Sequence, residues 1–159
     1  MSKFAAKRVL ITGGASGIGR IMGRMALEHG AEVLIVWDIN RENLDRVLSE
    51  FAPLGAVYGY TVDISDTQAV EECYNRVKRD VGRVDILINN AGIVTSNSTF
   101  DRLSIDEILR TMTINATAQM VVVYAPSQHH LTMPAYRHIC STAHSTRSVC
   151  SLYPPTYAV

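Results

Sequence analysis

An apolar run that ends in a cluster of glycines constrains the fold of this chain most strongly. Residues 9–11 (VLI) lead into residues 12–19 (TGGASGIG), and apolar residues then recur at helical spacing through Ile21, Met22 and Met25. This order predicts a buried strand, a tight turn and the start of a helix. Glycine lets backbone N–H groups approach an anionic ligand, and a helix N-terminus adds unpaired donors and partial positive charge. The stretch is therefore predicted to bind phosphate groups.

An acidic residue at the end of the next apolar run makes that prediction more specific. Asp38 follows residues 33–37 (VLIVW), about 20 residues after the last glycine of the turn. This spacing is typical of a carboxylate that binds the adenosine ribose of a dinucleotide. A P-loop is excluded, because Arg20 and Ile21 stand where Lys and Ser or Thr would be required. The alternative is a tight turn without a ligand, with Asp38 as an ordinary cap.

Further motifs along the chain resemble those of the short-chain dehydrogenase/reductase family. The matching residues are Thr12, Gly13, Gly17, Ile18, Gly19, Asp38, Asp63, Ile64 and residues 89–92 (NNAG). The resemblance extends over roughly residues 7 to 119 and is poor over residues 120–159. It implies an α/β fold with a Rossmann-type doubly wound parallel sheet, here incomplete at the C-terminal end. It also implies that residues 1–159 form a single, partial NAD(P)-binding domain.

Capping residues and periodicity predict the elements between these motifs. Asn40 is expected to cap a helix with an apolar stripe that ends at Phe51, and residues 57–62 read as a strand. Residues 65–68 (SDTQ) have the form of a capping box and are expected to open the next helix. Residues 84–88 (VDILI) predict a further strand. Strands that alternate with helices pair in parallel, so a ligand is expected at their carboxyl ends.

The segment after residue 92 is predicted to contain a polar loop and a long helix. Ser104 and Glu107 form a second capping-box pattern. Ile108, Leu109 and Met112 follow on one face. Asn is unfavourable inside a helix because its amide competes with the backbone. Asn115 on the same broad face is therefore a candidate functional residue, and a solvated Asn is the alternative.

Composition limits the partners of the chain. Fifteen Lys and Arg balance fifteen Asp and Glu, which argues against nucleic acid or an anionic membrane as the main partner. No apolar run is long enough to span a membrane, and the N-terminus lacks the apolar core of a signal peptide, so a cytoplasmic protein is expected. The three Cys are widely spaced and the His residues show no ligand spacing, so no disulfide framework and no metal site are predicted.

The resemblance assigns cofactor binding residue by residue. The residues concerned are Gly13, Ser16, Gly17, Ile18 and Gly19 in the turn, Asp38 at the ribose, Asp63 and Ile64 at the adenine, and Asn90, Ala91 and Gly92 behind the nicotinamide ribose. The Asp38 carboxylate would repel a 2′-phosphate, so NAD is favoured over NADP. Arg20 and Arg41 lie nearby in sequence and could partly offset that repulsion. Residues 90–92 are also ordinary turn formers.

The family's reaction is hydride transfer between nicotinamide and an alcohol or ketone. The resemblance implies Asn115, Ser141 and Tyr157 as catalytic residues, with Tyr157 as general acid or base. A phenol has a pKa of about 10, which a neighbouring Lys lowers in the family. A Lys four residues after Tyr157 would be residue 161 of a chain of 159 residues. Ser141 also precedes Tyr157 by three residues more than is usual in the family.

Residues 120–159 form an atypical tail. They contain no Asp or Glu, and Pro126 and Pro134 interrupt a segment that is a helix in the family. The tail is either a divergent segment or the product of an altered reading frame. Two functions therefore remain open: an NAD(P)-dependent oxidoreductase, or a non-catalytic nucleotide-binding protein or truncated fragment. In the family the helix with Asn115 contributes to a dimer interface, so a homo-oligomer is expected, with apolar Ile108, Leu109 and Met112 exposed without it.

Overall fold

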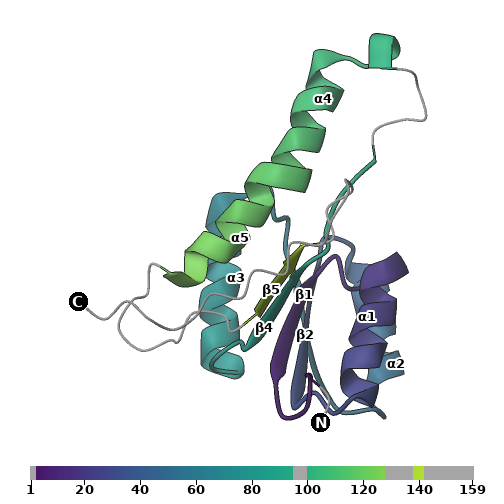
Figure 1. Cartoon of the computed structure of the whole chain (residues 1–159), viewed down its shortest axis with the longest axis vertical. Helices are drawn as coiled ribbons and strands as arrows, with labels where there is room; N and C mark the ends of the chain where they lie inside the picture. Colours follow the sequence, from purple (N-terminus) through teal and green to yellow (C-terminus); the bar gives the residue numbers. More distant parts are fainter. Residues whose placement is uncertain (1–2, 95–99, 128–137, 142–159) are drawn as a thin grey trace.

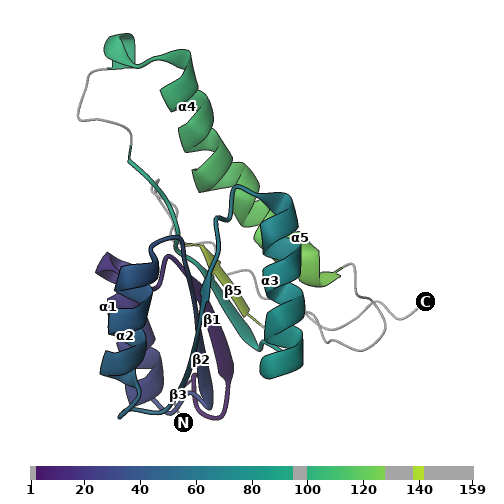
Figure 2. The same cartoon turned by 180° about the vertical axis from the view of Figure 1, so that it is seen from behind.

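Five parallel strands form the centre of the protein, for which a computed structural model describes residues 3–94, 100–127 and 138–141. Their order across the sheet is β3-β2-β1-β4-β5 (Figures 1 and 2). The strands are β1 (Arg8–Thr12), β2 (Val33–Asp38), β3 (Ala56–Thr61), β4 (Ile86–Asn89) and β5 (His138–Ser141). The predicted Rossmann-type parallel sheet is confirmed.

Helices cover both faces of this sheet, as right-handed crossovers between parallel strands require (Figures 1 and 2). The helices on one face are α1 (Gly17–Glu28) and α2 (Arg41–Phe51), and those on the other are α3 (Thr67–Asp80) and α5 (Ala118–Ser127). The short 3₁₀ turn η1 (Phe100–Arg102) precedes α4 (Ile105–Met112), and the π-helical turn η2 (Thr113–Thr117) joins α4 to α5.

The strand order reverses at β1, which pairs with both β2 and β4. Thr12 at the end of β1 is in register with Trp37, the residue before Asp38. On the other side, Ile11 is in register with Ile88, and Asn89 with Ser141. The carboxyl ends of four strands therefore meet at one edge, the position at which sheets of this kind bind ligands.

Strands β1, β2 and β4 are buried on both faces of the sheet, which explains their uninterrupted apolar runs. Val9 and Ile11 face a cluster made by α1 and α2, whereas Leu10 faces a cluster made by α3 and α5. All three side chains are fully buried. This core fixes the direction of β1 and hence the starting point of the glycine turn, residues 12–19. The buried thiol of Cys73 belongs to the same core, and burial raises its pKa to about 12.

Helix α1 packs against the sheet through Gly23, Ala26 and Leu27, while two of its large apolar residues face solvent. A Cβ on Gly23 would lie 3.1 Å from Leu34 and 3.2 Å from Phe51, so α1 approaches the sheet closely there. Ile21 and Met25 are exposed instead. The apolar spacing correctly predicts the helix, but the face that α1 buries includes Gly23, where the backbone approaches the sheet, and excludes Ile21 and Met25.

Two of the three predicted helix caps are confirmed. Asn40 accepts a hydrogen bond from the N–H of Asn43 at 2.9 Å, and Ser104 forms a complete capping box with Glu107. The capping box predicted at Ser65 is wrong, because Asp66 caps α3 by accepting from two backbone N–H groups. An ionised carboxylate interacts more favourably with a helix N-terminus than a hydroxyl does.

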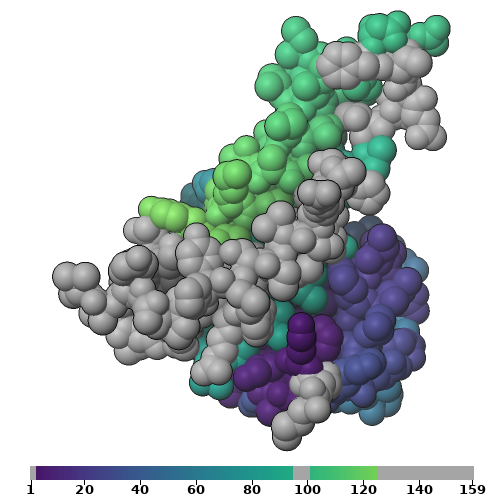
Figure 3. Space-filling view, in the orientation of Figure 1, coloured from purple at the N-terminus to yellow at the C-terminus, as the bar shows by residue number. Residues whose placement is uncertain are grey.

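The rod formed by α4, η2 and α5 extends beyond the carboxyl edge of the sheet (Figures 1 and 3). Helix α4 contains no buried residue, whereas α5 packs against α3 through Ala118 and Val122. The interruption expected near Pro126 is not found in the described part of this segment, since α5 includes Pro126 and Ser127. None of the helices within the described ranges is both long and apolar enough to cross a membrane.

Candidate functional site

The glycine turn is shaped by close backbone contacts that exclude side chains. Gly13 has a φ of +63°, and a Cβ there would lie 2.8 Å from Ala91 Cα. A Cβ on Gly19 would overlap the carbonyl oxygen of Gly13 and lie 2.5 Å from Asn90 Nδ2. Both positions therefore require glycine, and the turn is pressed against the residues that follow β4.

The outer side of the same turn is open. Gly17 has a φ of +49°, and no atom lies within 4 Å of the position that its Cβ would occupy. Ser16, Gly17 and Ile18 line a cleft there, at the N-terminus of α1. Free backbone and partial positive charge thus face open space, which is the environment that a diphosphate requires.

Asp38 lies beside the turn and is bonded to it. Its Oδ2 accepts from the N–H of Ala15 at 3.0 Å, and its Oδ1 accepts from the N–H of Asn40 at 2.9 Å. The residue is 9% exposed and lines the cleft. Each carboxylate oxygen can accept a second hydrogen bond. Asp38 can therefore bind hydroxyl groups of a ligand while it fixes the turn.

Asp63 and Ile64 follow β3 and border the same cleft. The Oδ1 of Asp63 accepts from the N–H of Ser65 at 2.9 Å and from its hydroxyl at 2.7 Å. Ile64 is buried in the core below. The predicted adenine-binding pair is thus held at the same edge as Asp38.

Thr12 joins the two inner strands at the site, a role that the sequence motif alone does not reveal. It is fully buried, and its Oγ1 accepts from the N–H groups of Asn90 and Ala91, both at 3.1 Å. The Asn90 side chain in turn donates to the carbonyl oxygens of Thr12 and Gly13, both at 3.0 Å. The side-chain amide of Asn90 therefore fixes the glycine turn. The signal in the sequence is a polar amide residue directly after the buried strand β4.

Asn115 lies in the π-helical turn η2, where the helix departs from regular α-helical geometry. Its Oδ1 accepts from the N–H of Ile93 and its Nδ2 donates to the carbonyl of Ile93, both at 2.8 Å. A Cβ on Gly92 would lie 3.2 Å from Asn115 Oδ1. The side chain of Asn115 thus binds the loop after β4 as a neighbouring strand would.

One cleft of about 630 Å³ connects these elements. The predicted cofactor-binding residues that line it are Gly13, Ser16, Gly17, Ile18, Asp38, Asp63, Ile64, Asn90, Ala91 and Gly92, and Asn115 lines it as well. Gly19 does not line the cleft. It lies behind the turn, where its lack of a side chain allows close contact with Gly13 and Asn90. Among the described residues that line the cleft, the charged ones are Asp38, Asp63 and Arg110.

Trp37 is a cleft residue that the sequence motifs do not single out. It is 2% exposed, lines the cleft next to Asp38, and its indole N–H has no hydrogen-bond partner among the described residues. A large aromatic side chain at the end of a buried strand reads simply as core, so no signal in the sequence identifies it.

Of the two remaining predicted catalytic residues, Ser141 and Tyr157, the structure describes only Ser141. Ser141 ends β5 at the carboxyl edge of the sheet, in register with Asn89 of β4, as the resemblance implies. Tyr157 lies outside the described residues, as do His129, His130 and His144.

Comparison with known proteins agrees with this geometry. The sequence profile of the family described as "short chain dehydrogenase" matches residues 7–135. Epidermal retinol dehydrogenase 2 of Mus musculus is 43% identical over 99 residues, 61% of this chain and 32% of that protein. The 3-oxoacyl-(acyl-carrier-protein) reductase FabG of Thermotoga maritima is 35% identical over 130 residues, 78% of this chain and 52% of that protein.

Solved structures with the same arrangement contain either nicotinamide cofactor. An NAD⁺-bound xylitol dehydrogenase matches with a TM-score of 0.75 and 30% identity, over 80% of this chain and 49% of that one. A short chain dehydrogenase from Burkholderia cenocepacia J2315 in complex with NADP matches with a TM-score of 0.72 and 29% identity, over 80% of this chain and 52% of that one.

The chain spans about half, or less, of the length of these relatives. The family profile nevertheless covers the glycine turn, Asp38, the residues after β4 and Asn115. The fold agrees over 80% of the chain. The chain therefore belongs to the short chain dehydrogenase family.

Proposed function

We propose that the cleft binds a nicotinamide dinucleotide and that the chain serves NAD-dependent oxidoreduction of an alcohol or ketone. The observation that carries this proposal is the position of Asp38 next to the open side of the glycine turn, within one cleft. A diphosphate at the turn would place the adenosine ribose within reach of a carboxylate that still has acceptor capacity. Family membership supports the same assignment.

The charges of the cleft favour NAD over NADP. Asp38 and Asp63 lie on the side that would receive the adenosine, and Arg110 is the one cation among the described residues that line the cleft. Arg20 and Arg41 are both paired with acids, Arg20 with Glu50 at 2.6 Å and Arg41 with Asp45 at 2.9 Å. Neither arginine offers the free cation that a 2′-phosphate would need.

The residues proposed to bind cofactor divide into three groups. Residues Gly13, Ser16, Gly17 and Ile18, in the turn that Gly19 shapes from behind, would receive the diphosphate; Asp38, Asp63 and Ile64 would receive the adenosine, and Asn90, Ala91 and Gly92 the nicotinamide ribose. The bound cofactor would supply or accept the hydride. Asn115, Ser141 and Tyr157 would serve proton transfer at the substrate oxygen, for which an acid or base within hydrogen-bond reach is needed.

Calorimetric titration with NADH and NADPH tests the binding proposal. We expect the wild type to bind NADH about tenfold more tightly than NADPH, because the Asp38 carboxylate would repel the 2′-phosphate of NADPH. A tenfold difference in affinity corresponds to about 1.4 kcal/mol. Gly17→Val should abolish binding of both, because its side chain would fill the space for the diphosphate. Retained affinity in Gly17→Val would remove the glycine turn from the site.

An assay with secondary alcohols tests the catalytic part separately. Turnover by the wild type that Tyr157→Phe removes, with NADH affinity unchanged, would support oxidoreduction. NADH binding without turnover in either protein would leave a nucleotide-binding chain without catalysis. That outcome is the second function that the sequence keeps open.

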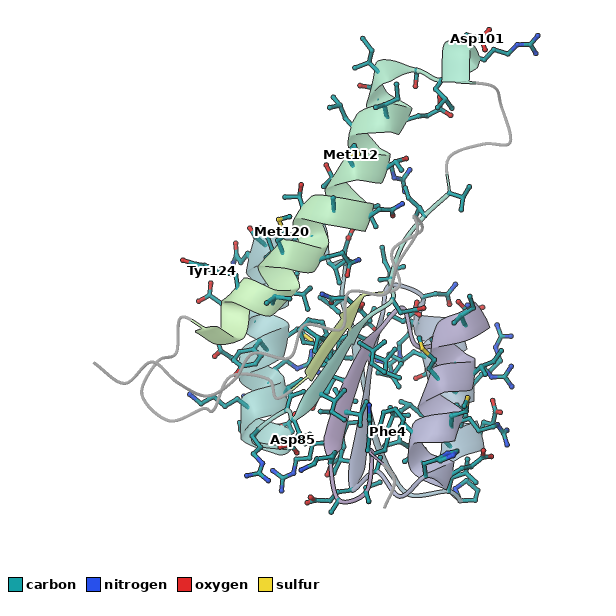
Figure 4. All side chains as sticks on the ribbon, in the orientation of Figure 1. Phe4, Asp85, Asp101, Met112, Met120 and Tyr124 are labelled. Atoms are coloured by element: carbon teal, nitrogen blue, oxygen red, sulfur yellow. The ribbon has the colours of Figure 1, made fainter. Side chains whose placement is uncertain are left out.

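Self-association through the rod of α4 and α5 is proposed as well. Ile105, Leu109, Met112, Met120 and Tyr124 are all exposed. Figure 4 shows Met112, Met120 and Tyr124 along the side of the rod that faces away from the sheet. Large apolar side chains exposed along a rod of this kind are typical of a surface that a partner covers.

A further inference from the structure

The wall of the cleft after β4 is fixed by side chains of other elements. At Ala91, the N–H donates to Thr12 Oγ1 at 3.1 Å and the carbonyl accepts from Gln119 Nε2 at 2.5 Å. Both backbone groups of Ile93 bind Asn115. The loop formed by residues 91–93 lines the cleft, and three side chains determine where its backbone lies.

Gln119 has no assigned role, although it connects several parts of this region. It belongs to α5, is 7% exposed and does not itself line the cleft. Its Nε2 also donates to the carbonyl of Ile114 in η2 at 3.2 Å. The backbone carbonyl of Gln119 accepts from Asn89 Nδ2 at 3.2 Å. The buried side-chain amide of Gln119 therefore ties the loop to the π-helical turn, and its backbone carbonyl binds the end of β4.

Ala91 is enclosed between Gln119 and the glycine turn. Its Cα lies 2.8 Å from the position that a Cβ on Gly13 would occupy, so the loop cannot move further toward the turn. Movement in the opposite direction would press Ala91 against Gln119 and break the bond from the Ala91 N–H to Thr12 Oγ1. The position of Ala91 is thus defined from both sides, and Gln119 supplies the outer restraint.

We propose that Gln119 is a positioning residue for the nicotinamide half of the bound dinucleotide. It acts through Ala91, whose place in the wall it determines, and does not touch the ligand. The inference rests on the proposed function, since it assigns the loop of residues 91–93 to the nicotinamide end. The adenosine end depends on Asp38 and the glycine turn, which Gln119 does not contact.

The side-chain oxygen of Gln119 allows its positioning role to be tested apart from its effect on folding stability. Its Oε1 is buried and has no hydrogen-bond partner among the described residues. Gln119→Leu removes two donor contacts, but it also removes this unsatisfied oxygen, and the two effects on folding oppose one another. The variant should therefore fold while its loop is less well restrained.

Comparison of NADH with ADP tests the proposal, because ADP contains only the adenosine diphosphate half. By calorimetry of the full chain, Gln119→Leu should bind NADH about tenfold more weakly and bind ADP within about twofold of the wild type. Gln68→Leu is the matched control: Gln68 is exposed on α3 and bonded to Glu72 at 2.9 Å. That variant should bind both ligands as the wild type does.

The outcomes separate this inference from the proposed function. An equal loss of NADH and ADP affinity in Gln119→Leu, or no loss of either, would overturn the positioning role alone. A wild type that binds neither ligand would contradict the proposed function and this inference together. A loss confined to NADH would support both.

Hydrogen exchange of the wild type gives a second test that needs no variant. NADH should slow exchange of the amides of residues 91–93 well beyond the effect of ADP, because only NADH reaches that wall. Equal protection by the two ligands would overturn the proposal, even if Gln119→Leu fails to fold.

Discussion

The two walls of the cleft are built in different ways. The sheet wall consists of the glycine turn and the residues that follow β2 and β3, and it continues strands whose side chains are fully buried, such as Leu10 and Ile35. The helix wall consists of residues 90–94 and Arg110–Asn115. It rests on hydrogen bonds from a few side chains, and α4 contributes no buried residue to the core.

This difference indicates which part of a ligand each wall can bind without help. The sheet wall is rigid because its position follows from strand pairing and from packing on both faces. The helix wall depends on Thr12, Asn115 and Gln119 and on whatever covers the exposed face of the rod. We therefore expect the adenosine end of the site to be preformed and the nicotinamide end to be more easily perturbed.

The largest effect is expected from Gly19→Ala, which introduces a steric clash behind the glycine turn of the sheet wall. The added Cβ would overlap the Gly13 carbonyl oxygen, and neither backbone can move without disturbing β1. We expect a loss of about 3 kcal/mol in the free energy of unfolding, measured by urea denaturation. A loss below about 1 kcal/mol would show that the turn adapts and that the wall is not rigid.

Gly17→Ala is the matched control in the same turn. Its Cβ would meet no atom within 4 Å, so only the positive φ of +49° opposes the substitution. The cost should be about 1 kcal/mol.

Thr12→Val should have the next largest effect, because it separates the two walls. The valine keeps the shape of the buried side chain but leaves the N–H groups of Asn90 and Ala91 without their acceptor. We expect a loss of about 2 kcal/mol in the free energy of unfolding. Thr61→Val, at an exposed position at the end of β3, should change stability by less than about 0.5 kcal/mol. Equal effects would show that the Thr12 hydroxyl does not join the walls.

The sheet wall could be predicted from the sequence almost completely, and the reason is local. The sequence pattern of a few neighbouring residues predicts the strand, the glycine turn, the start of the helix and the position of Asp38. Asn40, as a capping residue, likewise predicts the start of the next helix. The Ser65 cap was wrong because two capping residues compete within two positions, and the stronger acceptor, Asp66, takes the helix N-terminus.

Tyr60→Phe tests the support of the sheet wall below Asp63 and should cost about 1 kcal/mol. Its hydroxyl donates to Asp80 at 3.0 Å, and burial and then this bond raise the pKa of the phenol well above its usual range. The unfolded phenol ionises near pH 10, at about its ordinary pKa. Stability from Tyr60 should therefore be complete below that pH and fall as the pH rises above it.

Urea unfolding between pH 8 and pH 11 measures this dependence. Tyr60→Phe should flatten the alkaline decline, and the buried Tyr74, whose pKa is also raised by burial, should account for part of what remains. An unchanged alkaline decline in the variant would show that Tyr60 ionises as easily in the folded protein as in the unfolded chain.

Leu109→Glu should have the smallest effect on stability, because the side chain is 58% exposed on α4. We expect a change within about 0.5 kcal/mol. Sedimentation velocity should nevertheless show weaker self-association than in the wild type. A loss of 2 kcal/mol or more would reveal that Leu109 packs within the folded monomer and that the helix wall has its own core.

The helix wall could be predicted less well, because its contacts join residues far apart in the chain. The unfavourable place of Asn115 in a helix singles it out in the sequence, but no sequence pattern points to its partner Ile93. Gln119 reads as an ordinary helical residue, and its bond to Ala91 appears only in the folded structure. Ser141 and Tyr157 rest on the family resemblance, and the structure describes only the backbone position of the first.

Calorimetric titration of wild type and Asp38→Asn with NADH and NADPH tests the central claim most directly. The amide keeps the size of the carboxylate but removes the charge that would bind ribose hydroxyls and repel a 2′-phosphate. The account predicts that Asp38→Asn binds NADH about tenfold more weakly and loses the preference for NADH over NADPH. Unchanged affinity for NADH, with the preference intact, would contradict the assignment of Asp38 to the ribose and with it the proposed site.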